Sequence, residues 1–132
     1  MLKNIPVKFT QKTMLELIEP KFGGTFDYFY LPMDLKTQGS VGFAFINFVH
    51  PASIMRFYSE FQDAQWAELV DSCKSTKKCA IVYANVQGLE EIKAELRGKE
   101  IMKKREQAVR PYFVEAQPSD VSAIVRSEIA AA

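Results

Sequence analysis

The segment Val41–Val49 (VGFAFINFV) constrains the fold of this chain more than any other. It is rich in β-branched and aromatic residues, which predicts a strand. Side chains point to the two faces of a strand in turn, so one parity carries Gly42, Ala44, Ile46 and Phe48. The two small residues suit close packing under helices, or a bulge in the case of the glycine, and the two larger ones supply core bulk. We therefore expect this parity to face the core.

The other parity places Phe43 and Phe45 side by side on the opposite face. Two large rings in water call for an explanation. Stacking of nucleobases is one, because every base has a π-face and each stacked base contributes about 1–3 kcal/mol. The alternative is that a C-terminal helix or a partner covers the rings, and the alternation alone leaves both interpretations open.

The order of the other segments predicts the fold class. Strands are expected at residues 1–5, 26–31, 41–49 and 80–86, and helices after Thr10, after His50 and over Leu89–Leu96. The apolar stripe of the second helix is Ile54, Phe57, Tyr58 and Phe61. This order is that of the α+β, ferredoxin-like βαββαβ sandwich, in which two helices cover one face of an antiparallel sheet and leave the other open. We expect residues 1–87 to form this core, 88–116 to add a helix and a short strand at 110–115, and 117–132 to form a flexible tail.

The C-terminal helix has an apolar face that must be buried. Leu89, Ile92 and Leu96 share one side of it. Either the helix lies on the sheet over the two phenylalanines, or it packs at the side of the domain while RPYFVE pairs with a sheet edge. We favour the second arrangement, because the three glutamates of the helix would repel phosphates over a binding face. The basic stretch Lys99–Arg105 that follows could track a nucleic-acid backbone.

The composition is that of one ordinary globular domain. The chain has 132 residues, of which 48% are hydrophobic and 25% are charged, so a core can form without metals or disulfides. Its net charge is +1, so stacking must contribute more to any nucleic-acid affinity than bulk electrostatics does. Cys73 and Cys79 fit neither a CxxC motif nor a zinc site, and unpaired thiols are favoured over a disulfide.

Several function classes have no support in the sequence. It contains neither GxxxxGK[ST] nor GxSxG, and its one histidine, His50, precedes a proline at a helix start, so we expect no enzyme, no cofactor and no metal. No apolar run approaches the roughly 20 residues of a membrane helix, and the first residues are unlike a signal peptide. We therefore expect a nuclear or cytoplasmic protein without a membrane partner, monomeric as an isolated domain. The chain begins inside a predicted strand, so we also expect a segment of a longer protein.

The strand described first resembles a known RNA-binding motif. VGFAFINF matches the octamer of RNA recognition motif (RRM) domains, K/R-G-F/Y-G/A-F-V-x-F/Y, at seven of eight positions when Ile46 is counted for valine, with Val41 as the exception. The segment LKNI resembles the end of the companion hexamer. The resemblance implies base stacking on Phe43 and Phe45, and it puts Met1 where most RRMs carry a third stacking ring.

A closer resemblance covers residues 2 to about 114. The blocks KNIPVKFTQ, GTFDYFYLPMD, VGFAFINF, VYANVQG and RPYF are similar, in order and spacing, to the consecutive signatures of the Mei-two-like family of RNA-binding meiosis and differentiation regulators. Valine before the octamer glycine is also common in this family. The resemblance implies a single-stranded RNA-binding module of a larger post-transcriptional regulator, and it does not identify the RNA.

The expected RNA-contacting residues lie on or beside the open sheet face. Tyr28 and Tyr30 of the second strand are expected on the same face as Phe43, although they could instead contact the C-terminal helix. Two amides follow the fourth strand where RRMs often bond bases, and two lysines could reach phosphates or simply be solvated. The full set is Met1, Lys3, Tyr28, Tyr30, Lys36, Phe43, Phe45, Asn85 and Gln87. The rival function is protein interaction, with the sheet covered by a partner or by the C-terminal helix.

Overall fold

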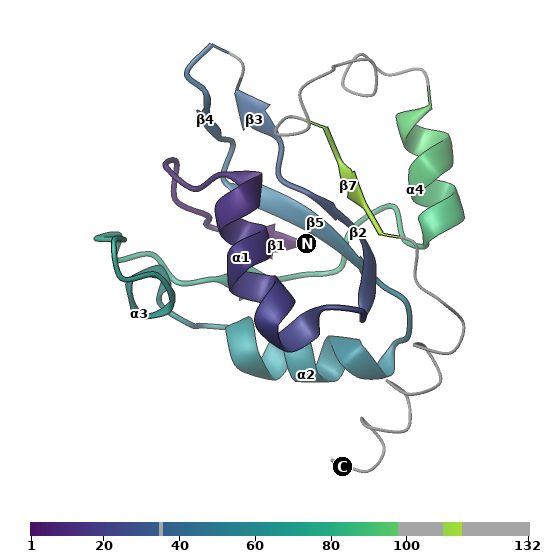
Figure 1. Cartoon of the computed structure of the whole chain (residues 1–132), viewed down its shortest axis with the longest axis horizontal. Coiled ribbons are helices and arrows are strands. Elements are labelled where there is room, and N and C mark those ends of the chain that lie inside the picture. The colour runs from purple at the N-terminus through teal and green to yellow at the C-terminus, as the bar shows by residue number, and fades with distance from the viewer. Residues whose placement is uncertain (35, 98–109, 115–132) are drawn as a thin grey trace.

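The computed structural model describes residues 1–34, 36–97 and 110–114. Its strands are β1 (Leu2–Lys3), β2 (Phe26–Tyr30), β3 (Met33–Asp34), β4 (Gly39–Ser40), β5 (Phe43–Phe48), β6 (Ala80–Ile81) and β7 (Tyr112–Phe113). Its helices are α1 (Gln11–Phe22), α2 (Ala52–Phe61), α3 (Trp66–Leu69) and α4 (Leu89–Leu96). Figure 1 shows how they are arranged.

An antiparallel five-stranded sheet, in the order β6-β1-β5-β2-β7, organises the described residues. The central strand β5 pairs with β2 on one side and with β1 on the other. With α1 between β1 and β2, and α2 between β5 and β6, this is the split βαβ arrangement of the ferredoxin-like fold. The expected fold class is confirmed. The short strand expected at 110–115 is present as β7 at the β2 edge, and the structure adds a separate β3-β4 hairpin.

The main core lies between the sheet and the helices α1 and α2. Phe22 of α1 is fully buried, and its ring centroid lies 5.1 Å from that of Phe57 and 5.9 Å from that of Phe61, both on α2. From the sheet, Leu2, Phe29 and Ala44 belong to the same buried cluster. The expected inward parity of β5 is confirmed, since Ala44 is buried and Ile46 and Phe48 pack against this cluster.

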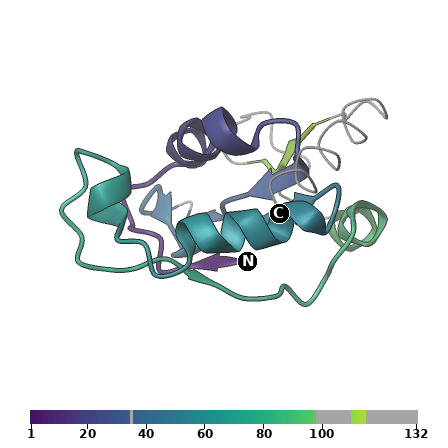
Figure 2. The same cartoon turned by 90° about the horizontal axis from the view of Figure 1, so that it is seen from below.

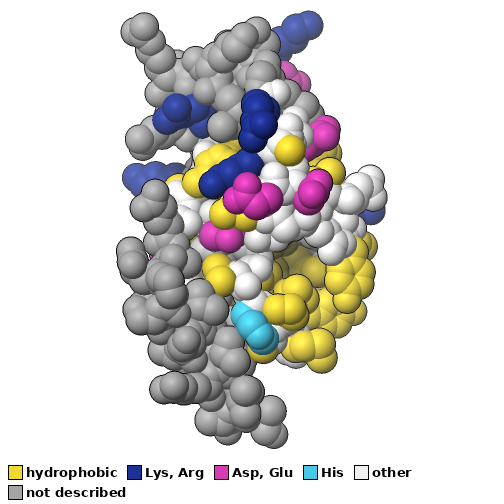
Figure 3. All heavy atoms as spheres, turned by 90° about the vertical axis from the view of Figure 1, so that its right-hand side faces the viewer, with side chains coloured by type: hydrophobic (Ala, Val, Ile, Leu, Met, Phe, Trp, Pro, Cys, Tyr) yellow, Lys and Arg dark blue, Asp and Glu magenta, His cyan; other side chains and the backbone are white. Residues whose placement is uncertain are grey.

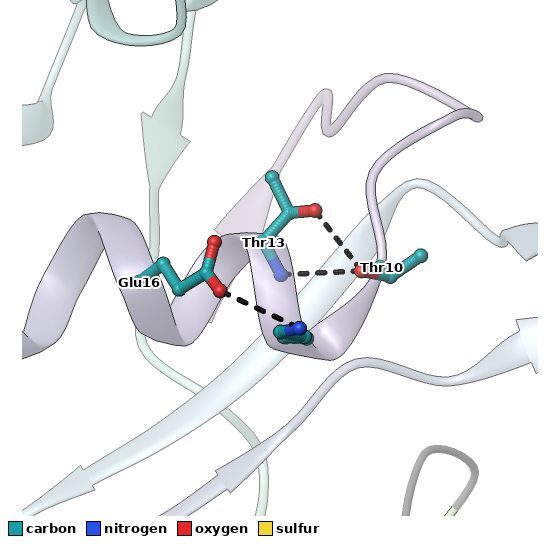
Figure 4. Close-up of polar contacts among 4 residues, drawn as sticks. Thr10, Thr13 and Glu16 are labelled. Atoms are coloured by element: carbon teal, nitrogen blue, oxygen red, sulfur yellow. Dashed lines mark hydrogen bonds and ion pairs between the residues drawn. The ribbon is translucent and has the colours of Figure 1, made fainter.

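Helix α1 begins at the residue that the sequence predicts. The Thr10 hydroxyl accepts a hydrogen bond of 3.1 Å from the backbone N–H of Thr13, which satisfies one of the free amides of the first turn (Figure 4). On the exposed side of the helix, the ammonium group of Lys12 and the carboxylate of Glu16 lie 3.9 Å apart. Met14 and Ile18 point the other way, into the core. The cap therefore fixes the start of a helix that carries part of the core.

Thr10→Ala is expected to lower the free energy of unfolding by about 1 kcal/mol, because the Thr13 amide loses its partner. Urea denaturation followed by circular dichroism measures the change. Lys12→Ala is the control and should change stability little, because exposed ion pairs contribute little. Equal losses in the two variants would contradict the capping role of Thr10.

Several segments depart from the sequence prediction. The first strand, expected at residues 1–5, covers only Leu2–Lys3. β5 begins at Phe43 and not at Val41, because Gly42 adopts a φ of +100° and breaks the ladder, as in the bulge reading of this glycine. The fourth strand, expected at 80–86, ends at Ile81. Its ladder to β1 continues only through the mutual hydrogen bonds of Met1 and Val82. The short helix α3 was not predicted, and its Trp66 is fully buried in the main core.

The apolar stripe of α2 is only half buried. Phe57 and Phe61 reach the core as expected, whereas Ile54 and Tyr58 are exposed. The periodicity identified the stripe correctly but could not show where the covering surface ends. Strand β6 ends at Ile81, and no described strand follows it before α4, so Ile54 and Tyr58 are left facing solvent.

The remaining sequence expectations concern the cysteines, membrane helices and the C-terminal segments. Cys73 and Cys79 are both free, as expected, and burial raises the pKa of the Cys79 thiol to about 12. Among the described residues no helix is long and apolar enough to cross a membrane. The basic stretch Lys99–Arg105 and the tail 117–132 lie outside the described residues.

Candidate nucleic-acid interface

The open face of the sheet carries an aromatic pair on β5. Phe43 and Phe45 have ring centroids 5.6 Å apart with their planes 77° from parallel. Lys3 pairs with Phe43 across the strands, so its exposed side chain leaves the same face. The Phe43 side chain is 37% exposed, the largest exposed fraction among the phenylalanines of the described residues. A ring held this way on a rigid strand offers a flat apolar surface to a ligand.

A second group of side chains covers the neighbouring part of the same face. We call it the α4 cluster: Tyr28, Ile92 and Leu96 are buried in it, and Tyr30, Phe45, Leu89 and Phe113 pack against them. The rings of Tyr28 and Phe113 lie 5.2 Å apart. The apolar stripe of α4 therefore lies on the two tyrosines and on one of the two octamer rings, next to β7 (Figure 1).

The favoured position of the C-terminal helix is therefore wrong in one respect and right in another. RPYFVE does pair with a sheet edge, since Tyr112 and Phe113 pair with Phe29 and Tyr28. The helix nevertheless contacts the face that was expected to stay free. The two arrangements had been treated as alternatives, but Phe113 of β7 is itself part of the α4 cluster. The edge strand thus helps to build the surface on which the helix lies.

Asn47 of β5 anchors the start of α4 to the sheet. Its Nδ2 donates to Oδ1 of Asp27 at 2.8 Å, and its Oδ1 accepts a 3.2 Å hydrogen bond from the backbone N–H of Gly88. Gly88 has a φ of +87°, which lets the chain turn directly into the helix. Parity placed Asn47 on the open face, but nothing in the sequence indicated these partners.

The two tyrosines of the face are neutral hydrogen-bonding groups. Burial raises the pKa of Tyr28, with a smaller contribution from neighbouring Tyr30, and burial also raises the pKa of Tyr30. Both phenols therefore stay protonated at physiological pH and add no negative charge to the face. Tyr28 is only 3% exposed, because α4 covers it.

The remaining expected site residues fall into two places. Met1, Asn85 and Gln87 line a groove with a volume of about 830 Å³ that also includes Phe43 and Phe45 in its wall. In Figure 3, hydrophobic side chains border a hollow below a group of charged ones.

Lys36 lies elsewhere. It is exposed in the turn between β3 and β4, where its backbone N–H donates to Oδ1 of Asp34. The structure thus brings all the expected residues except Lys36 to one face or its rim.

The chemistry of this face is that of a binding surface. No group of three or more His, Cys, Asp or Glu side chains that could hold a metal ion occurs in the part of the chain that the structure describes. What the face presents is exposed aromatic area, a lysine and two amides. The family described as RNA recognition motif 2 matches residues 1–97.

The chain belongs to the RNA recognition motif 2 family.

Individual relatives agree with this family assignment. The chain is 42% identical over 88 residues to protein MEI2-like 2 of Oryza sativa subsp. japonica, covering 67% of this chain and 10% of that protein. It is 34% identical over 130 residues to protein MEI2-like 5 of Arabidopsis thaliana, covering 97% of this chain and 16% of that protein. The chain therefore spans between a tenth and a sixth of these curated relatives. The Mei-two-like resemblance is confirmed.

The RNA recognition motif 2 match covers the sheet with its aromatic pair and extends to the end of α4. It thus includes the helix that lies on the open face, together with Asn47, which holds the start of that helix. In this chain, the C-terminal helix thus covers part of the sheet face that carries the aromatic pair. β7 lies beyond the matched residues.

Proposed function

We propose that this domain binds single-stranded RNA on the open face of its sheet, with bases stacking on Phe43 and Phe45. The observation that carries the proposal is the exposed Phe43 ring, held beside Phe45 on the octamer strand of a chain that belongs to an RNA recognition motif family. RRM domains read unstacked bases on aromatic side chains of the sheet. Family membership supports RNA binding in general, and the stacking geometry is our proposal.

Phosphates and base edges are contacted from the rim of the face. Lys3 leaves the sheet beside Phe43 and is placed to neutralise a phosphate. Asn85 and Gln87 are exposed next to the groove and offer amide groups to base edges, and the methionine at position 1 offers an apolar surface beside them. Lys36, on the distant hairpin, would contact only a longer RNA. Few cations of the described residues border the face, so the salt dependence of binding should be shallow.

Helix α4 limits access to this face. Phe45 is half-buried in the α4 cluster, while Phe43 lies outside it. Glu95 on the same helix borders the groove and brings a carboxylate close to where phosphates would pass. RNA that stacks on both rings must therefore displace α4 or shift it. Phe43 is the first contact, and Phe45 and the two tyrosines become available only when α4 moves.

The domain would serve a larger regulator. The relatives are several times longer than the match, and we propose that this domain supplies RNA binding to a post-transcriptional regulator of meiosis or differentiation.

Phe43→Ala is expected to weaken binding to single-stranded RNA by about 5- to 100-fold, because one stacked base contributes about 1–3 kcal/mol. Fluorescence anisotropy with a labelled random-sequence RNA of about ten nucleotides measures the dissociation constant. Phe43→Tyr keeps a flat ring and should retain most of the affinity.

Val7→Ala is the control, because Val7 is an exposed apolar side chain that does not line the groove. Its affinity should equal that of the unchanged protein. If Phe43→Ala binds RNA as tightly as Val7→Ala, the stacking proposal fails. If the unchanged protein binds no RNA, the face serves a protein partner instead.

A further inference from the structure

A β-bulge in β2 brings an acidic side chain to the open face of the sheet. The register of the β2–β5 pairing shifts between Phe26 and Tyr28, which makes Asp27 the extra residue. In a regular strand Phe26 and Tyr28 would share a face, yet Phe26 is buried in the main core and Tyr28 in the α4 cluster. Bulges often re-aim a side chain next to a functional site. The side chain re-aimed here is that of Asp27, which bonds to Asn47 on the open face.

Asn47 connects this carboxylate to the start of α4. Its Nδ2 donates to Oδ1 of Asp27, and its Oδ1 accepts from the backbone N–H of Gly88. A carboxylate only accepts and a backbone N–H only donates, so these partners fix the orientation of the Asn47 amide. The chain reaches Gly88 along the extended stretch that leads from β6 to α4 (Figure 2). The amide therefore ties the end of that stretch to the sheet while α4 lies on the face.

Displacement of α4 changes what the two side chains offer. RNA that stacks on Phe45 has to shift the helix, and when Gly88 moves with it, Oδ1 of Asn47 loses its donor. The other carboxylate oxygen of Asp27, Oδ2, accepts no hydrogen bond from the described residues. The open state therefore has two hydrogen-bond acceptors on adjacent side chains of the sheet face. Acceptors in such a place call for donors from the ligand.

We propose that Asp27 and Asn47 form a base-reading subsite that selects guanine. This inference rests on the proposed function, because it needs a base stacked on the sheet. Asn47 lies two residues beyond Phe45 on the same face of β5, about 6.8 Å along the strand, so a base on Phe45 can direct an edge toward it. The Watson–Crick edge of guanine carries two adjacent donors, N1–H and the 2-amino group. They match the two acceptors, and unstacked bases are read on this edge.

The other three bases match these acceptors less well. Adenine and cytosine each place a ring-nitrogen acceptor beside a single amino group, and uracil has one N–H between two carbonyls. Each of them sets an acceptor against the Asp27 carboxylate or leaves an acceptor of the subsite without a donor, which is costly. A well-matched bidentate contact discriminates between bases by roughly 5- to 150-fold. Guanine and the start of α4 also use the same oxygen of Asn47, so guanine binding and closure of the helix exclude each other.

The test uses the whole 132-residue chain and short labelled oligouridines whose central base is uracil, adenine, cytosine, guanine or hypoxanthine. Fluorescence anisotropy gives the dissociation constants. The guanine RNA should bind the unchanged protein at least roughly fivefold more tightly than the uracil, adenine and cytosine RNAs. Hypoxanthine lacks the 2-amino group and should fall between guanine and uracil.

Asp27→Asn puts an amino group where the free carboxylate oxygen was, and it should abolish the preference for guanine. The variant can also loosen α4, but that changes the affinity for every RNA alike and cancels in the ratio of two dissociation constants. Asp71→Asn is the matched control, because it removes the same charge at an exposed position that does not line the groove. It should keep the full preference.

Two results would overturn the subsite while leaving the stacking proposal in place. One is equal affinity of the unchanged protein for all five RNAs. The other is a guanine preference that survives in Asp27→Asn, which would show that the pair only anchors α4. Failure of the proposed function looks different: no RNA binds, or Phe43→Ala leaves all five dissociation constants unchanged, and both proposals then fall together. With the subsite in place, Phe43→Ala weakens binding of every RNA and keeps the preference for guanine.

Discussion

Replacing Ile92 and Leu96 of α4 by alanine is expected to release the helix from the sheet and to raise the affinity for single-stranded RNA by on the order of tenfold. Both side chains are buried in the α4 cluster, and truncation of a buried aliphatic side chain costs about 2–5 kcal/mol. The covered state of the face loses that stabilisation, whereas the open state does not. RNA then no longer has to displace the helix from Phe45.

Two measurements check this prediction. Hydrogen exchange should become faster in α4 while the amides of β2 and β5 stay protected, which shows local opening without unfolding. Fluorescence anisotropy should show the tighter RNA binding. Val7→Ala, an apolar truncation at a 59% exposed position outside both the α4 cluster and the groove, should leave both unchanged. Weaker RNA binding in the double variant would mean that α4 belongs to the RNA-contacting surface and is not a competitor.

Phe22→Ala is expected to lower the free energy of unfolding by about 3–5 kcal/mol, the cost typical of removing a buried ring. Phe22 is fully buried, and its ring contacts those of Phe48, Phe57 and Phe61. The guanidinium of Arg56 also lies 5.2 Å from its centroid. Alanine would leave a cavity at the junction of α1, α2 and the sheet.

Thermal and urea denaturation measure this loss, which should correspond to a drop in melting temperature of roughly 12 to 20 °C. Tyr58→Ala serves as the control, because its ring is 48% exposed and little packing is lost. A change in Phe22→Ala as small as that in the control would show that the aromatic group is not the centre of the core. Phe48 is only half-buried, so Phe48→Ala should cost less than Phe22→Ala.

The sequence by itself determined the parts of the structure that depend on neighbouring residues. Alternation along β5 predicted the inward side of Ala44 and the outward side of Phe43, because a strand turns each successive side chain to the other face. Thr10 predicted the start of α1, because a threonine hydroxyl can satisfy an amide three residues ahead. The order of strands and helices then restricted the sheet to one common topology.

Only the tertiary structure decided which surface each apolar stripe meets. Periodicity showed that α4 has an apolar face, but both the sheet and the side of the domain could receive it. The choice rests on Tyr28, Phe113 and the Asn47–Gly88 hydrogen bond, which come together only after β2, β5 and β7 have paired. The partner of an apolar stripe therefore depends on segments far apart in the chain, and the periodicity of the stripe itself does not contain that information.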